Sequence, residues 1–249
     1  MLVREKAMFT KGLLLMGSFL VILFLMFQPV FPGGHNGLEY SDEFFNQLSK
    51  GSSFFIPEIA ETVKKQEGKA ISLTFDMKSA AIPEGVKNLK KDEVPAKAAQ
   101  LLTSAGFEAA ASGSQLTVKG DLAKMLSGVL ADSEAMFKAQ GQAPQIRDMD
   151  GKAALTVWWN VLNSMIKPLQ KEKQIEAANL VDLVAKKGIE PAYNFYGVES
   201  KSVLSSAGLL LAGLLIFYVV YTMWYGYAIF DIFGGIGLSM KKSKVKKEH

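Results

Sequence analysis

One apolar segment near the C-terminus constrains the fold of this chain more than any other feature. Residues 203–240 contain a single acidic or basic side chain, that of Asp231. Such a segment is stable in hydrocarbon, and at ~1.5 Å per helical residue it is long enough to cross a membrane. We therefore predict a transmembrane helix over residues 203–228. The basic residues that follow should stay on the cytoplasmic side, because lysines near a span resist translocation. They are Lys241, Lys242, Lys244, Lys246 and Lys247, and we also expect them to contact anionic lipid.

The same segment is too long for a single crossing. As one helix, residues 203–240 would reach roughly 57 Å, whereas the hydrocarbon core of a bilayer is ~30 Å thick. We therefore predict that residues 229–249 form an interfacial segment followed by a basic cytoplasmic tail. Asp231 then lies at headgroup depth. The alternative is an intramembrane acid that takes part in proton or cation transfer, although neither predicted span offers it a basic partner.

A pair of small residues in this segment is typical of close helix packing. Gly208 and Ala212 are four positions apart and lie on one face of the predicted helix. That face could dock against the first span or against the helix of a partner protein.

A second apolar run, residues 12–31, follows a basic tail at residues 1–11. It could be a cleaved signal or a permanent anchor. The sequence after it lacks the small-x-small pattern of a signal cleavage site, so we predict an anchor. Both tails are basic, which places both termini in the cytoplasm and residues 34–202 on the periplasmic or external side of the inner (cell) membrane.

Composition excludes several classes of chemistry. The chain has no cysteine, which excludes thiol catalysis, disulfides and cysteine-ligated metals. Its only histidines are His35 and His249, too few for a histidine metal site. The net charge of +4 comes from the two tails, so the middle of the chain has no basic excess that would indicate nucleic-acid binding. We expect no enzyme activity, no cofactor and no metal.

The region between the spans predicts an α+β domain. Residues 32–69 are predicted to form a membrane-proximal linker with short helices, the first capped by Ser41. Within residues 70–140, alternating and helical apolar patterns predict the order β-α-β-β-α. The strands are expected at residues 70–76, 107–111 and 115–119, and the helices at 94–105 and 122–139. A small sheet with helices on one face would bury these apolar stripes.

Residues 141–202 predict a helical hairpin and an aromatic membrane-proximal segment. Its arms are expected at residues 152–171 and 173–187. Trp158 and Trp159 point about 100° apart on a helix, so one of them could bind a partner protein; the alternative is that both are covered within the domain. The aromatic residues 189–202 are expected at the outer membrane interface.

The fold class predicted is thus a membrane-anchored α+β protein, with two transmembrane helices flanking an external domain. The function predicted is that of a non-enzymatic accessory or scaffold subunit in a larger membrane complex. Its partners would be the lipid bilayer and other membrane subunits or further copies of the chain. A sensor or ligand-binding module is the alternative, and a transport or energy-coupling subunit that uses Asp231 is the third.

Overall fold

The computed structural model describes residues 3–199 and 208–238. The chain divides into two compact units. The first, here called the apolar helix pair, comprises Met1–Leu48 and Lys201–His249, and the second, the α+β unit, comprises Ser49–Ser200. The predicted mixture of helices with a small sheet is confirmed. The first residues of the predicted second span and the five C-terminal lysines lie outside the described residues.

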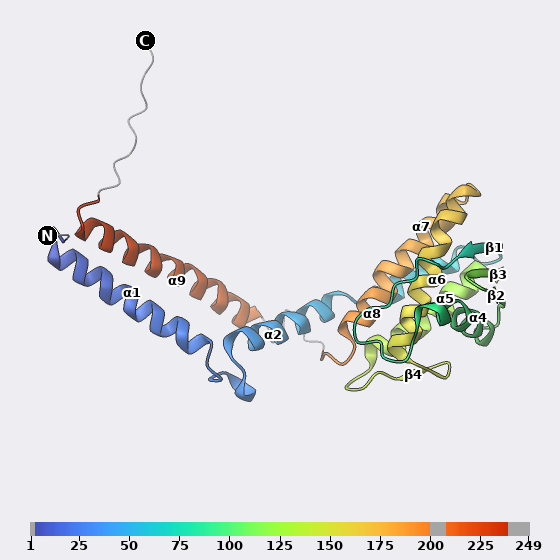
Figure 1. Cartoon of the computed structure of the whole chain (residues 1–249), viewed down its shortest axis with the longest axis horizontal. Helices are drawn as coiled ribbons and strands as arrows, with labels where there is room; N and C mark the ends of the chain where they lie inside the picture. Colours follow the sequence, from blue (N-terminus) through green and yellow to red (C-terminus); the bar gives the residue numbers. More distant parts are fainter. Residues whose placement is uncertain (1–2, 200–207, 239–249) are drawn as a thin grey trace, which may run out of the picture. The chain divides into compact units, whose positions relative to one another are not determined.

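Two long helices, α1 (Lys6–Met26) and α9 (Gly208–Gly235), run side by side in the apolar helix pair (Figure 1). They are antiparallel, because the backbone N–H of Arg4 donates to the carbonyl of Gly235 at 2.9 Å, while the ring of Phe19 stacks on Tyr221 with centroids 4.4 Å apart. Both helices are long and apolar enough to cross a membrane.

The bounds of these helices differ from the predicted ones. Helix α1 begins at Lys6, inside the predicted tail, and ends before the Gln28-Pro29 pair. Helix α9 continues to Gly235, through the start of the predicted interfacial segment. It ends in a Schellman motif, in which Gly237 has a φ of +84° and the N–H of Leu238 donates to the carbonyl of Phe233.

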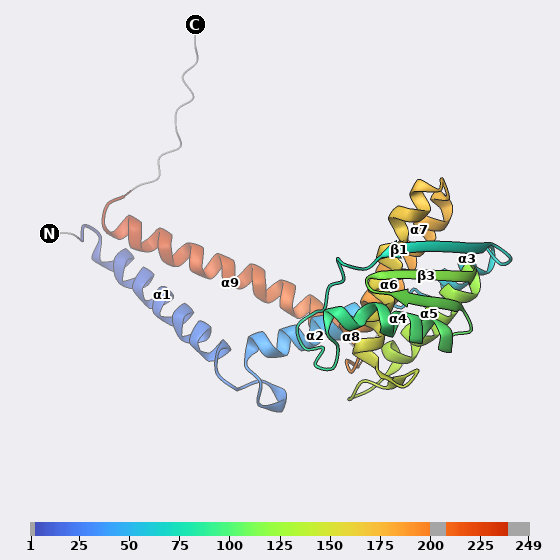
Figure 2. The same ribbon diagram turned by 45° about the vertical axis from the view of Figure 1, so that its right-hand side comes forward.

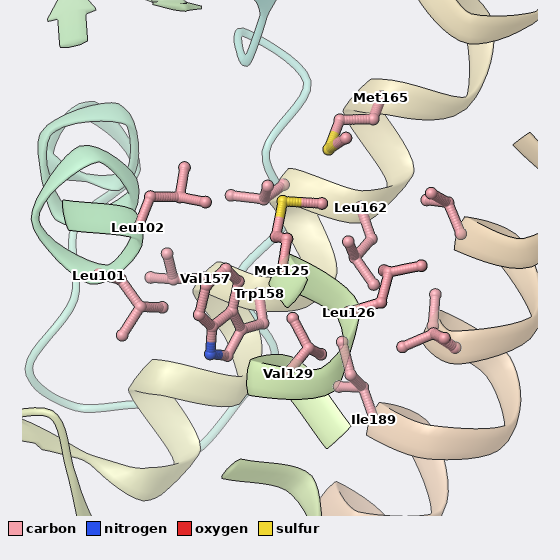
Figure 3. Close-up of a cluster of buried hydrophobic side chains, with 14 of the residues drawn as sticks. Leu101, Leu102, Met125, Leu126, Val129, Val157, Trp158, Leu162, Met165 and Ile189 are labelled. Atoms are coloured by element: carbon pink, nitrogen blue, oxygen red, sulfur yellow. The ribbon is translucent and has the colours of Figure 1, made fainter. Parts of the chain in front are cut away.

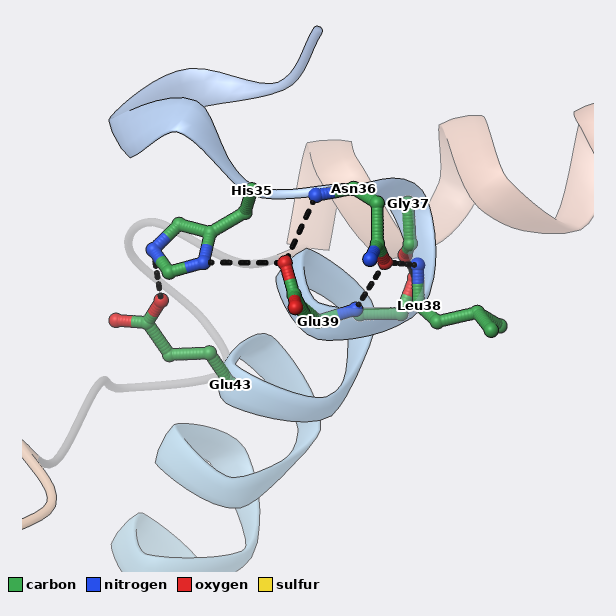
Figure 4. A network of polar contacts seen from close by, with 7 residues as sticks. His35, Asn36, Gly37, Leu38, Glu39 and Glu43 are labelled. Atoms are coloured by element: carbon green, nitrogen blue, oxygen red, sulfur yellow. Dashed lines mark hydrogen bonds and ion pairs between the residues drawn. The ribbon is translucent and has the colours of Figure 1, made fainter. Parts of the chain in front are cut away.

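Helix α2 (Gly37–Ser52) follows a short 3-10 turn, η1 (Pro32–Gly34). Asn36 caps it, because its side-chain oxygen accepts from the N–H groups of Leu38 and Glu39, both at 2.9 Å (Figure 4). The carboxylate of Glu39 returns a bond to the N–H of Asn36, and His35 lies between Glu39 and Glu43. The predicted Ser41 cap is therefore wrong: the helix and its cap begin five residues earlier, since Asn36 satisfies its first N–H groups.

The sheet of the α+β unit has three antiparallel strands in the order β1-β3-β2. They are β1 (Ala70–Asp76), β2 (Glu108–Ser112) and β3 (Gln115–Asp121). In β1, Ile71, Leu73 and Phe75 are buried and the residues between them are exposed, as the alternating pattern predicted. Leu73 pairs with Val118 of β3.

Helices cover the apolar face of this sheet, as Figure 2 shows for α4, α5 and α6. In chain order the remaining elements are α3 (Ile56–Lys64), η2 (Lys91–Glu93), α4 (Val94–Ser104), α5 (Leu122–Lys138), β4 (Gln145–Ile146), β5 (Met149–Asp150), α6 (Gly151–Lys171), α7 (Ile175–Val184), a π-helical turn η3 (Ala185–Ile189) and α8 (Glu190–Phe195). The residues just before α6, for which the sequence predicted no strand, thus contain a two-stranded ribbon.

A single hydrophobic core joins the two predicted parts of this unit (Figure 3). Leu102 of α4, Met125 of α5 and Trp158 of α6 converge there, together with Ile189. The predicted subdomain 70–140 and the helical hairpin after it therefore form one folded body.

The aromatic residues of α8, and Tyr196 just after it, also belong to this body. Tyr193, Phe195 and Tyr196 pack against the core while remaining partly exposed. Their packing against the core does not test the prediction that residues 189–202 lie at the outer membrane interface, which stays a prediction. The amphipathic character of the rings fits a domain surface as well as a lipid interface, and sequence alone does not separate the two.

Candidate functional site

The contact between α1 and α9 is built on glycines. A Cβ atom added to Gly12 would lie 2.6 Å from the backbone nitrogen of Ile232, and one added to Gly235 would lie 2.7 Å from the Cα atom of Phe9. Real Cβ atoms do not approach so closely, so only glycine allows the helices this separation. Close packing through small residues is the usual way in which helices associate in lipid.

An ion pair crosses the same contact. The Nζ atom of Lys11 lies 3.0 Å from Oδ2 of Asp231, and Asp231 is only 5% exposed. The separation is that of an ion pair, although the angle does not meet hydrogen-bond geometry. A buried carboxylate is stable only when a compensating charge is near it. Lys11 supplies that charge.

The predicted isolation of Asp231 is therefore wrong. Lys11 was assigned to the N-terminal tail because it precedes the apolar run, but α1 begins at Lys6 and carries Lys11 on its second turn. A long lysine side chain near a helix end can reach along the helix. The length of the apolar run in the sequence does not reveal this.

The predicted small-residue pair lies elsewhere on α9. Gly208 and Ala212 are exposed, and a Cβ atom added to the neighbouring Gly213 would meet nothing within 4 Å. This face does not form the contact with α1; its docking to a partner helix stays a prediction. Gly12 and Gly235, which do form the contact, were visible in the sequence as glycines within apolar runs.

Trp158 lies in the centre of the α+β unit. It is fully buried, and its indole N–H donates to Oδ2 of Asp132 at 2.8 Å. The prediction that it could bind a partner is wrong, because the core covers it. The same carboxylate oxygen accepts from Nε of Arg147 at 2.8 Å.

Arg147 reaches Asp132 from the ribbon between β4 and β5. Arg147 and Asp148 form its turn and both have positive φ, 49° and 63°, a conformation that non-glycine residues rarely adopt. The arginine also donates to the carbonyl of Ser104 at 3.1 Å. These bonds tie the ribbon to α4 and α5, and sequence analysis did not identify them.

Trp159 is partly buried against the core and also lines a cavity. The cavity has a volume of about 420 Å³. Leu155, Thr156 and Trp159 of α6 form one side of it, and Ile189, Glu190 and Tyr193 line it from η3 and α8. The indole N–H of Trp159 donates to Oε1 of Glu190 at 3.2 Å. Of the two tryptophans, Trp159 is thus the one available to a ligand or partner.

The loop after β1 also lines the cavity, and Asn160 holds that loop in place. The amide oxygen of Asn160 accepts from the N–H of Ala81, and its amide nitrogen donates to the carbonyl of Ala81, both at 2.8 Å. A second bond from the same nitrogen reaches the carbonyl of Thr156. Asn160 is buried, so these bonds satisfy its polar atoms and fix residues 81–83 at the cavity.

Within residues 3–199 and 208–238, no group of three or more acidic or histidine side chains is placed to hold a metal ion. No family model matches the chain, and no curated protein or solved structure matches it significantly.

Proposed function

We propose that this chain is a non-enzymatic protein of the inner membrane, held there by α1 and α9, with residues 34–202 on the external or periplasmic side. It would act as an accessory or scaffold subunit of a larger membrane assembly. The proposal has two parts, the placement in the membrane and the role there, which different observations support.

The antiparallel packing of α1 and α9 is the observation that carries the placement. Because the helices are antiparallel, Arg4 lies beside the end of α9, from which the chain continues into its lysine-rich tail. Both basic segments thus belong to the same end of the helix pair, as expected if that end faces the cytoplasm. The outward surface is apolar: Leu14 is 70% exposed and Leu209 is 89% exposed, which suits contact with lipid.

The small-residue face of α9 supports the role as a subunit. Gly208 and Ala212 leave a shallow, exposed strip on which a partner helix could pack closely. Replacing both by leucine should leave the α1–α9 contact intact and release the partner. Purification in mild detergent, with the chain's native membrane as the source, tests this: stoichiometric partners lost in the leucine variant support the proposal, and a monomer in both cases contradicts it.

The cavity beside Trp159 favours a second function, that of a ligand-binding module. Its volume falls in the range of roughly 300–1,000 Å³ that is usual for small-molecule sites, and its lining combines apolar and aromatic residues with a few polar groups. Ligand-dependent thermal shifts of the full chain, abolished when Trp159 is replaced by alanine, would support this function.

The third function, transport or energy coupling through Asp231, has less support. The ion pair with Lys11 compensates the charge of the carboxylate, which favours a structural role in joining the helices. Asp231→Asn should abolish coupling if the acid carries protons. It should change only the stability of the helix pair if the acid is structural.

A further inference from the structure

Strand β2 forms an open edge of the three-stranded sheet (Figure 1). It pairs with β3 on one side, and it is the last strand in the order β1-β3-β2. The backbone groups of an exposed edge invite further strands, so proteins usually guard such edges with lysine, proline or a bulge. Residues 109–112 of β2 are Ala-Ala-Ala-Ser and pair with β3 without a bulge. This edge therefore lacks the usual protection.

The hydrogen-bond pattern shows which groups of β2 face the open edge. The N–H of Met77 donates to the carbonyl of Ser114 at 2.9 Å, so in this register the even-numbered residues of β3 bond to β1. Bonding alternates along an antiparallel strand, so the odd-numbered residues of β3 bond to the even-numbered residues of β2. The N–H and C=O groups of Ala109 and Ala111 therefore point away from the sheet. Within residues 3–199 and 208–238, nothing forms a hydrogen bond with them.

The side chains along this edge leave the backbone accessible. Ala110 and Ala111 are exposed, although alanine is not favoured in strands by its intrinsic propensity. An open hollow of about 460 Å³ lies beside the first half of the strand, and Thr103, Phe107 and Ala109 are among its lining residues. Three small side chains in a row suit a site at which a second backbone approaches closely.

We infer that β2 pairs with β2 of a second copy of this chain, antiparallel and about a two-fold axis at Ala110. In this register, Ala109 of each copy exchanges hydrogen bonds with Ala111 of the other, so every outward-facing group of these residues gains a partner. A two-fold contact requires a surface that is complementary to itself, and the alternation in β2 supplies one. The inference names a second copy as a partner of the proposed membrane subunit and rests on that role.

Size and charge agree with this register. Ala110 meets itself at the axis as a non-hydrogen-bonded pair, in which the Cα atoms are only ~4.5 Å apart. Two alanine side chains fit there. Glu108 lies opposite Ser112 of the second copy, so no like charges face each other, and it is already paired with Lys119 in its own sheet.

Cysteine crosslinking of the full chain in native membranes tests the register, since the chain has no cysteine of its own. Ala110→Cys brings two thiols together at the axis, within the Cα separation that a disulfide spans, so mild oxidation should crosslink two copies. Ser112→Cys lies on the same strand and face, but its two thiols would be roughly 13 Å apart, so it should crosslink at less than about a tenth of the rate. Coexpression of Glu108→Cys with Ser112→Cys should restore crosslinking between unlike copies.

Charges placed at the axis test the contact without a crosslink. Ala110→Lys and Ala110→Glu each set like charges against each other, and each should lower the recovery of a differently tagged copy by roughly fivefold. Coexpressed, the two variants set opposite charges at the axis and should recover each other. This recovery separates a lost contact from a lost fold, because an unfolded variant would not regain its partner. Thr74→Lys, on the edge strand β1, is the control and should change nothing.

The outcomes separate the inference from the function beneath it. The inference is wrong if Ala110→Cys crosslinks no faster than Ser112→Cys, or if the oppositely charged variants fail to recover each other. Faster crosslinking through Thr74→Cys would also overturn it, in favour of the β1 edge. The proposed role survives these failures if other subunits still copurify with the wild-type chain, whereas a wild-type chain recovered as a monomer would overturn both.

Discussion

The apolar helix pair and the α+β unit each enclose a carboxylate, but they do so in opposite ways. Asp231 meets one cation, Lys11, across a contact made of glycines. Asp132 meets two donors, Arg147 and Trp158, beside a core of large side chains. One contact is held by close backbone approach, and the other by side-chain packing and hydrogen bonds.

The difference follows from the solvent expected around each unit. In water, burial of large apolar side chains drives folding at roughly 25 cal/mol per Å². In lipid that driving force is absent between helices, so close packing and polar contacts hold them together. The exposed leucines of α1 and α9 and the alternating exposure of β1 fit these two situations.

The largest effect is expected in the core of the α+β unit. Trp158→Ala should lower the free energy of unfolding by about 3–5 kcal/mol, because it leaves a cavity and removes a donor from Asp132. Trp159→Ala, at the partly exposed neighbour, should cost less than half as much. Urea unfolding of the full chain followed by near-UV circular dichroism measures both, and equal losses would contradict the placement of the two rings.

A smaller effect is expected between the helices, where two glycines of α1 give a matched pair. Gly12→Ala should destabilise the contact by about 1–3 kcal/mol, the usual cost of overpacking, because its Cβ would meet Ile232. Gly17→Ala should be neutral or stabilising, since a Cβ there meets nothing within 4 Å and alanine favours helix. The measurement is the loss of energy transfer between dyes attached to α1 and α9 as the SDS concentration is raised. If both variants separated at the same midpoint SDS concentration, the glycine contact between α1 and α9 would be excluded.

The ion pair should contribute less. Lys11→Met leaves Asp231 unpaired, and we expect a loss of about 1–2 kcal/mol, below the value of ~3–5 kcal/mol for a fully buried pair, because Lys11 is 69% exposed. Lys6→Met, at another exposed lysine of α1, is the control. The same SDS titration applies, and Lys11→Met combined with Asp231→Leu should recover most of the loss. If the double variant had a less stable contact between α1 and α9 than Lys11→Met alone, a structural role for the ion pair would be contradicted.

The smallest effect concerns pH and the end of β1. The N–H of Lys78 donates to Oδ1 of Asp76 at 2.8 Å, and this bond holds the pKa of Asp76 below its ordinary value of 3.8. A carboxyl group with a lowered folded-state pKa adds stability above its unfolded pKa and loses it as the pH falls through the folded-state value. Asp76→Asn should therefore destabilise the α+β unit slightly at pH 7 and less at pH 2. Asp92→Asn is the exposed control, and a loss that is the same at both pH values would rule out this linkage.

The local elements could be predicted because their patterns are local. The alternation in residues 70–76 and the amphipathic stripe of residues 122–139 each match an observed element closely. Helix ends were less predictable. Asn36 and not Ser41 caps α2, because both residues can cap a helix and only the geometry of the preceding turn decides between them.

The candidate sites could be predicted only in part, because they depend on distant residues. The sequence singled out Trp158 and Trp159, but it did not show which one the core would cover. Likewise, Asp231 was identified, while its partner lies more than two hundred residues away in the chain. The cavity was not anticipated, since Thr156 and Glu190 have no spacing that indicates a shared site.

The placement of the α+β unit outside the membrane, with both basic ends inside, is the central claim, and cysteine labelling tests it most directly. The chain has no native cysteine, so Glu67→Cys in the α+β unit and Lys247→Cys in the tail give two unique thiols. We expect a membrane-impermeant maleimide to label Glu67→Cys in intact cells and Lys247→Cys only after permeabilisation. Labelling of the tail and protection of the α+β unit in intact cells would contradict the account.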